Sequence, residues 1–182
     1  RDKNRKSDSK VILEMGKVVG IKSSKYLRKI NQENNIRYTY NHIARFNNPR
    51  DREIFRRLPQ GGNAEHHSIS DIMPYKTRRH IFKDKYYKLK IQSVCKTITS
   101  HMRLDCNMYI HPTQARGLTP REAARIQGFP DNYIFSGRSN KTYEQIGNAV
   151  PPPLAQTIGE SIKIAAAGFK RNEKKEKYSS VL

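Results

Sequence analysis

The sequence predicts a small α+β fold, and three features of the chain support this. Residues 86–90 and 93–100 are rich in aromatic or β-branched side chains, a composition typical of strands. Residues 119–122 read Thr-Pro-Arg-Glu, the sequence of a capping box with proline at the first helical position. After the prolines at 151–153, apolar side chains recur at every fourth residue through 154–162. This spacing predicts a C-terminal helix with one apolar stripe.

The first half of the chain carries weaker signals. Residues 1–10 are polar and are expected to be frayed, whereas short apolar groups within 11–40 predict short strands. Asn-Pro at 48–49 predicts the start of a helix that Pro-Gln-Gly-Gly at 59–62 ends. Residues 68–81 predict a second helix, interrupted by a proline.

The chain is strongly basic, with 36 Lys and Arg against 16 Asp and Glu and a formal net charge of +20. This balance predicts a polyanionic partner, either nucleic acid or an acidic membrane surface. The charge is spread along the chain, and no apolar run approaches the roughly 20 residues that span a bilayer, so nucleic acid is favoured over a membrane. Hydrophobic residues make up only 35% of the chain, which indicates a large exposed or partner-covered surface.

Cysteine usage and the start of the chain bear on the compartment. Cys95 and Cys106 are not spaced as zinc ligands, and the histidines do not cluster with them, so we expect reduced thiols and no metal site. No basic-then-apolar leader is visible at the start. We therefore expect a cytoplasmic, nucleoid-associated protein of bacterial or phage type.

Two long motifs carry a resemblance to a known family. Residues 116–131 read RGLTPREAARIQGFPD and residues 143–155 read YEQIGNAVPPPLA. In order and spacing they resemble motifs IX and X of the DNA (cytosine-5)-methyltransferases. Upstream, KTIT at 96–99 and YIHP at 109–112 are similar to the end of that family's target-recognition region.

The resemblance implies a fold and a division of the chain. Family members have a doubly wound α/β domain that binds S-adenosylmethionine and a small mixed domain that reads DNA across a cleft. Residues 1–115 would form the target-recognition region, and 116–168 the motif IX–X segment of the cofactor domain. Residues 169–182 would form a disordered basic tail, because they are rich in lysine. The C-terminal helices would pack on a doubly wound α/β catalytic domain that this chain lacks.

The parts of the family that perform the chemistry are not recognisable here. The family's nucleophile lies in a Pro-Cys loop, but Cys95 follows Val94 and Cys106 follows Asp105. The Glu-Asn-Val motif and the Gly-rich cofactor loop are also missing, so no catalytic residue is assigned. The chain is then expected to be inactive alone, as a piece of a longer enzyme or the smaller subunit of a divided one. Its partners would be duplex DNA and the N-terminal catalytic region, or large subunit, that carries the Pro-Cys loop.

The resemblance also implies binding residues. Asn148 and Val150 would contact S-adenosylmethionine, the alternative being that Gly147-Asn148 is only a tight turn into the last helix. The residues expected to contact DNA are Lys76, Arg78, Arg79, Thr97, His101, Arg103, Arg121 and Arg125.

Different roles are expected within the DNA-binding set. Arg103 can read guanine with its planar fork or contact phosphate. The basic cluster at 76–79 favours phosphate contact. Arg121 and Arg125 lie four apart, so one would brace the recognition region while the other reaches phosphate; a solvated helix face is the alternative.

The function implied is S-adenosylmethionine-dependent methyl transfer to C5 of cytosine in duplex DNA, in a restriction–modification, phage or orphan setting. A stand-alone DNA-binding module or regulator derived from such an enzyme is the first alternative. A generic basic RNA-binding protein is the second. A neighbouring polypeptide with the Pro-Cys loop would distinguish the first two readings.

Overall fold

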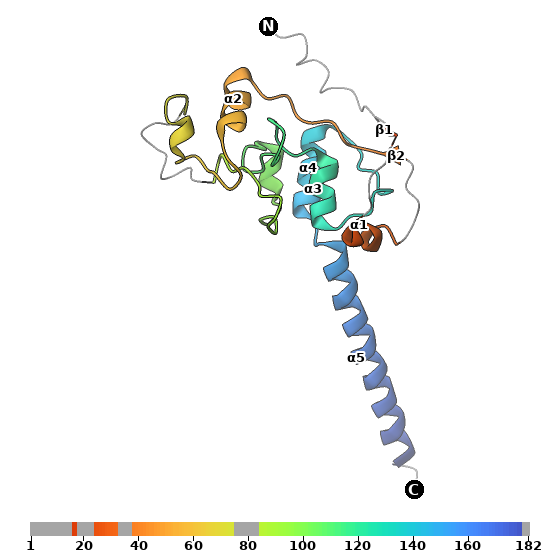
Figure 1. Cartoon of the computed structure of the whole chain (residues 1–182). Coiled ribbons are helices and arrows are strands. Elements are labelled where there is room, and N and C mark those ends of the chain that lie inside the picture. The colour runs from red at the N-terminus through yellow and green to blue at the C-terminus, as the bar shows by residue number, and fades with distance from the viewer. Residues whose placement is uncertain (1–15, 18–23, 33–37, 75–83, 180–182) are drawn as a thin grey trace. The chain divides into compact units, whose positions relative to one another are not determined.

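The structure, a computed structural model, describes residues 16–17, 24–32, 38–74 and 84–179 (Figure 1). The chain divides into two compact units, Arg1–Ala149 and Val150–Leu182. The elements of the described residues, in chain order, are β1 (Gly16–Lys17), α1 (Lys25–Ile30), β2 (Tyr38–Thr39), α2 (Pro49–Arg57), the 3₁₀ turns η2 (His67–Ile69) and η3 (Ser100–Arg103), α3 (Pro120–Gln127), α4 (Ser139–Asn148) and α5 (Pro152–Ser179).

The first unit is small and mixed, with mostly helices and little strand. Within the described residues the sheet is two-stranded, with Gly16 paired to Thr39 and Lys17 to Tyr38. The strand predicted at 86–90 is instead a series of isolated bridges, because successive residues bond to different segments. Tyr87 donates its N–H to Asn107, Lys88 to Gly62 and Leu89 to Ile110. Residues 93–99 are irregular, so the second predicted strand is also absent from the described chain.

Helix α2 confirms the prediction for residues 48–58. The Asn48 side chain accepts from the Asp51 N–H at 2.8 Å and so satisfies a free donor of the first turn. Its buried face joins a hydrophobic cluster of Ile54, Phe55, Leu58, Ala64, Ile69, Met73, Tyr86 and Ile110. The helix predicted from residue 68 is only the short turn η2, and residues 75–81 of that prediction lie outside the described residues.

Helix α3 contains the predicted capping box. The Thr119 hydroxyl accepts from the Glu122 N–H at 3.2 Å, and the Glu122 carboxylate accepts from the Thr119 N–H at 2.8 Å. Gly128 ends the helix with φ of 87°, a left-handed conformation that favours glycine. Ala123 and Ala124 are fully buried, and because their side chains are small the neighbouring elements can pack closely against α3.

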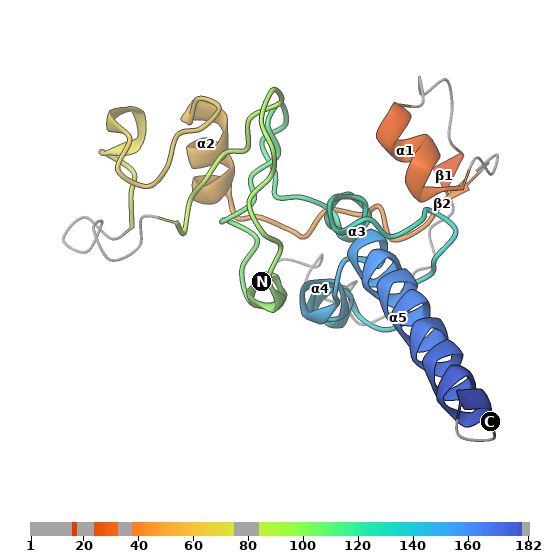
Figure 2. The same cartoon turned by 90° about the horizontal axis from the view of Figure 1, so that it is seen from below.

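Helix α4 was not predicted. It has no side-chain N-cap, and its buried face is limited to Thr142, Tyr143 and Ile146. It is stabilised by tertiary packing beside α3 and η3, as both views show for the two helices (Figures 1 and 2). The Tyr143 hydroxyl donates to the Leu118 carbonyl at 2.6 Å, which ties α4 to the chain entering α3.

Helix α1 was also missed, since its region was predicted to form strands. The Ser24 side chain caps its N-terminus. Asn31 at its end exchanges two hydrogen bonds with Asp131, and the Tyr26 hydroxyl donates to the Arg125 carbonyl at 2.7 Å. These contacts tie α1 to the end of α3.

The second unit is essentially the helix α5. Its start at Pro152 confirms the predicted C-terminal helix, but it continues to Ser179, where a disordered tail from residue 169 was expected. Lysine and glutamate are good helix formers, so the loss of apolar residues need not end a helix. None of the described helices is long and apolar enough to cross a membrane.

Candidate functional site

The segment from Thr97 to Arg103 packs directly on α4. A Cβ added at Gly147 would lie 2.2 Å from the Ser100 N and the Thr99 carbonyl carbon, far inside van der Waals contact. Only glycine permits this approach. The segment is also fixed from the other side, because the Tyr109 hydroxyl donates to the Thr97 carbonyl at 2.6 Å.

Three of the residues predicted to contact DNA are exposed on this segment. Thr97, His101 and Arg103 are all accessible. Arg103 lies 3.4 Å from the carboxylate of Glu144 on α4, and its carbonyl accepts from the Arg45 guanidinium at 2.9 Å. The first contact orients the Arg103 guanidinium and the second holds its backbone, while almost half of the side chain remains exposed.

Arg121 has a different position from the one a DNA contact requires. Its side chain is fully buried, and its guanidinium donates to the carbonyls of Tyr40 (2.9 Å), Pro130 (3.1 Å) and Tyr133 (2.6 Å). Burial lowers the pKa of this guanidinium from its ordinary value. Arg121 therefore joins α3 to two other chain segments, at Tyr40 and at 130–133, and its donors are not available to a phosphate in this arrangement.

Arg125 is largely engaged as well. Its guanidinium bonds to both carboxylate oxygens of Asp131, at 2.7 and 3.1 Å, and its side chain is only one-fifth exposed. Because Asp131 is itself held by Asn31, the pair joins α3 to the end of α1.

The two predicted cofactor contacts flank the end of α4. Asn148 is exposed in the last turn of α4, and Val150 is 59% exposed. Gly147 and Asn148 are thus helical and do not form the tight turn expected from the sequence. Gln127 of α3 donates to the carbonyls of Ile146 (3.1 Å) and Ala149 (3.3 Å), which fixes the backbone where α4 ends.

Lys76, Arg78 and Arg79 lie outside the described residues, so the structure neither joins them to this site nor separates them from it.

Glu122 has a role that sequence reasoning missed, since it was predicted only as a helix cap. Its carboxylate accepts two hydrogen bonds from Arg116, both at 2.7 Å, and lies 3.7 Å from His111. Although burial opposes it, the hydrogen bonds from Arg116 and Thr119 hold the pKa of Glu122 below its ordinary value. All members of this network lie between residues 111 and 122, but the capping-box pattern accounts only for the contact with Thr119.

Both thiols are poorly suited to act as nucleophiles. Burial raises the pKa of Cys106 to about 11 and also raises the pKa of Cys95. Cys106 is buried against Gly117, and its Sγ lies 3.5 Å from the Met102 carbonyl. Among the described residues, no three His, Cys, Asp or Glu side chains are arranged to hold a metal ion.

The fold and site define a basic module in which an exposed segment rests on a glycine-bearing helix. The model of the C-5 cytosine-specific DNA methylase family matches residues 2–164, and the chain belongs to this family.

Curated relatives agree with this assignment. The chain is 36% identical over 138 residues to the type II methyltransferase M.Bpa9945I of Bacillus paralicheniformis. The matched region covers 72% of this chain and 31% of that protein. It is 44% identical over 84 residues to the type II methyltransferase M.AgeI of Thalassovita gelatinovora, covering 46% of this chain and 20% of that protein. A rice protein, DNA (cytosine-5)-methyltransferase 1B, is 57% identical over 58 residues, or 32% of this chain and 4% of that protein. The chain thus spans less than a third of the length of each of these relatives.

Proposed function

We propose that this chain is the DNA-recognition part and one cofactor wall of a DNA (cytosine-5)-methyltransferase, and that it is inactive by itself. The observation that carries the proposal is the packing of residues 97–103 on α4. A segment that offers side chains to DNA rests on the helix whose end offers Asn148 to the cofactor.

The reaction explains why a second polypeptide region is needed. Cytosine C5 becomes reactive when the base leaves the duplex, a thiolate adds at C6 and an acid supports N3. Since Cys95 and Cys106 have raised pKa values and Cys106 is buried, neither supplies that thiolate. An N-terminal catalytic region, or a large subunit, contributes the Pro-Cys loop.

On the cofactor side, Asn148 and Val150 form one wall of the S-adenosylmethionine site. Both are exposed, and Gln127 holds the carbonyl of Ala149 between them. This suits a surface that is completed by the catalytic region. The bound cofactor supplies the methyl group, and the residues of this chain orient it.

On the DNA side, Thr97, His101 and Arg103 contact the duplex, together with Lys76, Arg78 and Arg79. Arg103 is the base-reading candidate, because a guanidinium fork matches guanine O6 and N7. Arg121 is left out of this set because it is buried, and Arg125 serves mainly to hold α3 to α1.

The domain assignment follows from these roles. Residues 1–115 read DNA, residues 116–168 belong functionally to the cofactor domain, and the apolar stripe of α5 packs on the doubly wound α/β domain of the catalytic region. Residues 169–182 form a basic extension. The type II relatives favour a restriction–modification setting. The strongly basic charge favours a place on DNA at the bacterial nucleoid.

A stand-alone DNA-binding module is the second candidate. The observation that favours it is that the first unit has its own buried core around Met102, Tyr109 and Tyr143. Both candidates bind duplex DNA, but only the first is activated by a catalytic region.

The test is duplex binding measured by fluorescence anisotropy against salt concentration, beside calorimetry with S-adenosylmethionine. We expect weak, strongly salt-dependent binding of DNA, because the charge of +20 acts mainly on phosphates. We expect no micromolar binding of the cofactor, since most of its site is elsewhere. DNA affinity that does not change with salt, or tight cofactor binding by this chain alone, would contradict the proposal.

A further inference from the structure

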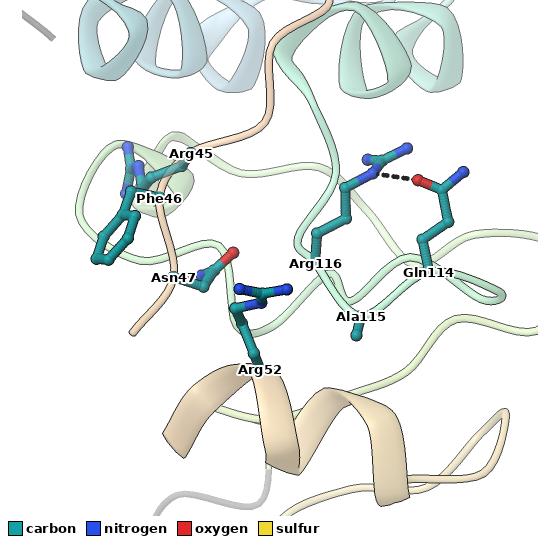
Figure 3. A pocket seen from close by; sticks show the side chains of 7 residues that line it. All are labelled: Arg45, Phe46, Asn47, Arg52, Gln114, Ala115 and Arg116. Carbon is teal, nitrogen blue, oxygen red and sulfur yellow. Dashed lines mark hydrogen bonds between the residues drawn. The ribbon is translucent and has the colours of Figure 1, made fainter. Parts of the chain in front are cut away.

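A concave site of about 400 Å³ lies between the chain that enters α2, the first turn of α2 and the chain that enters α3 (Figure 3). Its lining residues are mainly cations and amides: Arg45, Phe46, Asn47, Arg52, Gln114, Ala115 and Arg116. None of these seven described residues is acidic. Three guanidinium groups around one concavity favour an anionic ligand.

The three arginines differ in how far the fold already uses their charge. Arg116 is paired with both oxygens of Glu122, so its charge is offset within the protein. Arg45 donates to the neutral Arg103 carbonyl at 2.9 Å and lies 5.1 Å from the centre of the Tyr143 ring, so its position is fixed while its charge is not cancelled.

Arg52 is the most available of the three. Its side chain is exposed and has no hydrogen-bond or ion-pair partner within the part of the chain that the structure describes. Figure 3 shows it extending from α2 into the space between Asn47 and Ala115. A fixed cation and an unpaired one therefore line the same site.

We propose that this site binds a phosphodiester group of the DNA backbone, with Arg52 as its main donor and Arg45 as a fixed second charge. The inference rests on the proposed function, and it adds a contact outside the 97–103 segment. The amides of Asn47 and Gln114 can supply neutral donors: Gln114 uses its Oε1 to accept from Arg116, so its amide nitrogen remains a donor.

Two features favour nucleic acid over free phosphate. The Phe46 ring beside the arginines is 56% exposed, and aromatic rings next to cations are typical of surfaces that hold nucleic acid. Arg45 also donates to the Arg103 carbonyl, so a phosphate bound by Arg45 would be held beside the 97–103 segment that reads the bases. Phosphate contacts of this kind set the register of a protein on its duplex.

The test compares the full chain with Arg52→Ala, Arg52→Lys and the matched control Arg56→Ala, which removes a cation from the same helix outside the site. Affinity for labelled duplexes of several sequences is measured by anisotropy from about 50 to 200 mM salt, with circular dichroism as a check on folding. We expect Arg52→Ala to weaken binding roughly threefold to tenfold for every sequence and to reduce the salt slope by about 0.9. Arg52→Lys should keep most of the slope, and Arg56→Ala should have a clearly smaller effect.

Each other result has a defined meaning. Equal losses from Arg52→Ala and Arg56→Ala, or an unchanged salt slope, would contradict the site while leaving the proposed function intact. Displacement of the duplex by inorganic phosphate beyond its effect on ionic strength would assign the site to free phosphate and overturn the DNA assignment. If the unmodified chain binds no duplex, both the proposed function and this inference fail.

Discussion

Arg121 and Arg125 stand four residues apart on α3, yet the protein uses them differently. Arg121 is buried on three carbonyls, whereas Arg125 forms an ion pair with Asp131. The sequence predicted that one of the two would brace the recognition region, but it could not tell which. Both have the same local spacing, and only contacts with segments such as Tyr40, 81 residues away, distinguish them.

Replacement of Arg121 by alanine should destabilise the first unit. The change would remove three hydrogen bonds to carbonyls and a fully buried side chain, and at about 1 kcal/mol for each hydrogen bond it costs about 3 kcal/mol or more. Urea unfolding followed by circular dichroism should show a lower midpoint for Arg121→Ala and almost no change for Arg138→Ala, whose side chain is exposed. Equal midpoints for Arg121→Ala and the unmodified chain would refute the bracing role.

Gly147 offers a second test at the level of one residue. In an isolated helix, alanine is more favourable than glycine by about 1 kcal/mol. Here the added Cβ would clash with Ser100 and Thr99, so Gly147→Ala should destabilise the protein by roughly 1–3 kcal/mol and weaken duplex binding. Gly159→Ala in α5 is the matched control, because apart from the neighbouring backbone of its own helix no heavy atom of the described chain lies within 4 Å of its added Cβ. Thermal unfolding should therefore give opposite signs for the two variants, and a shared sign would refute the contact.

Among the helices, those with local start and stop signals were predictable. The caps at Asn48 and Thr119, each followed by proline, specify α2 and α3 within a few residues of sequence. Helix α4 has no such cap and is held by partners such as Leu118. The strand predicted at 86–90 failed for a related reason: its backbone partners are distant, and they change from residue to residue.

Helix α5 has an exposed apolar stripe that would be stabilised by packing against another protein surface. Leu154, Ile158 and Ile162 are 52%, 49% and 63% exposed, and burying each is worth roughly 1.5–3 kcal/mol. Ile158→Asp should therefore abolish co-purification with the catalytic region, and it should also remove any self-association of this chain. Gln156→Asp is the control for the effect of the added charge alone, because it introduces the same charge on the opposite side of the helix. Co-purification that withstands Ile158→Asp would show that the stripe is not the docking surface.

For the whole molecule, the family and the absence of its catalytic motifs could be read from the sequence. Motifs IX and X are contiguous, so they are visible in a single chain. The candidate site was only partly predictable: Thr97, His101 and Arg103 are exposed, but the roles of Gly147 and Arg52 depend on contacts between distant segments. The ion pair of Glu122 with Arg116 is near in sequence, but it is not part of the capping-box pattern. Long-range packing is the part of the fold that local patterns do not encode.

On the proposed function, methyl transfer needs this chain together with a catalytic region. The direct measurement is incorporation of labelled methyl groups from S-adenosylmethionine into mixed-sequence duplex DNA, by this chain, by the catalytic region and by both. We predict label in the DNA only for the mixture, reduced by Asn148→Asp or Val150→Lys. Efficient labelling by this chain alone, abolished by Cys95→Ser or Cys106→Ser, would contradict the account.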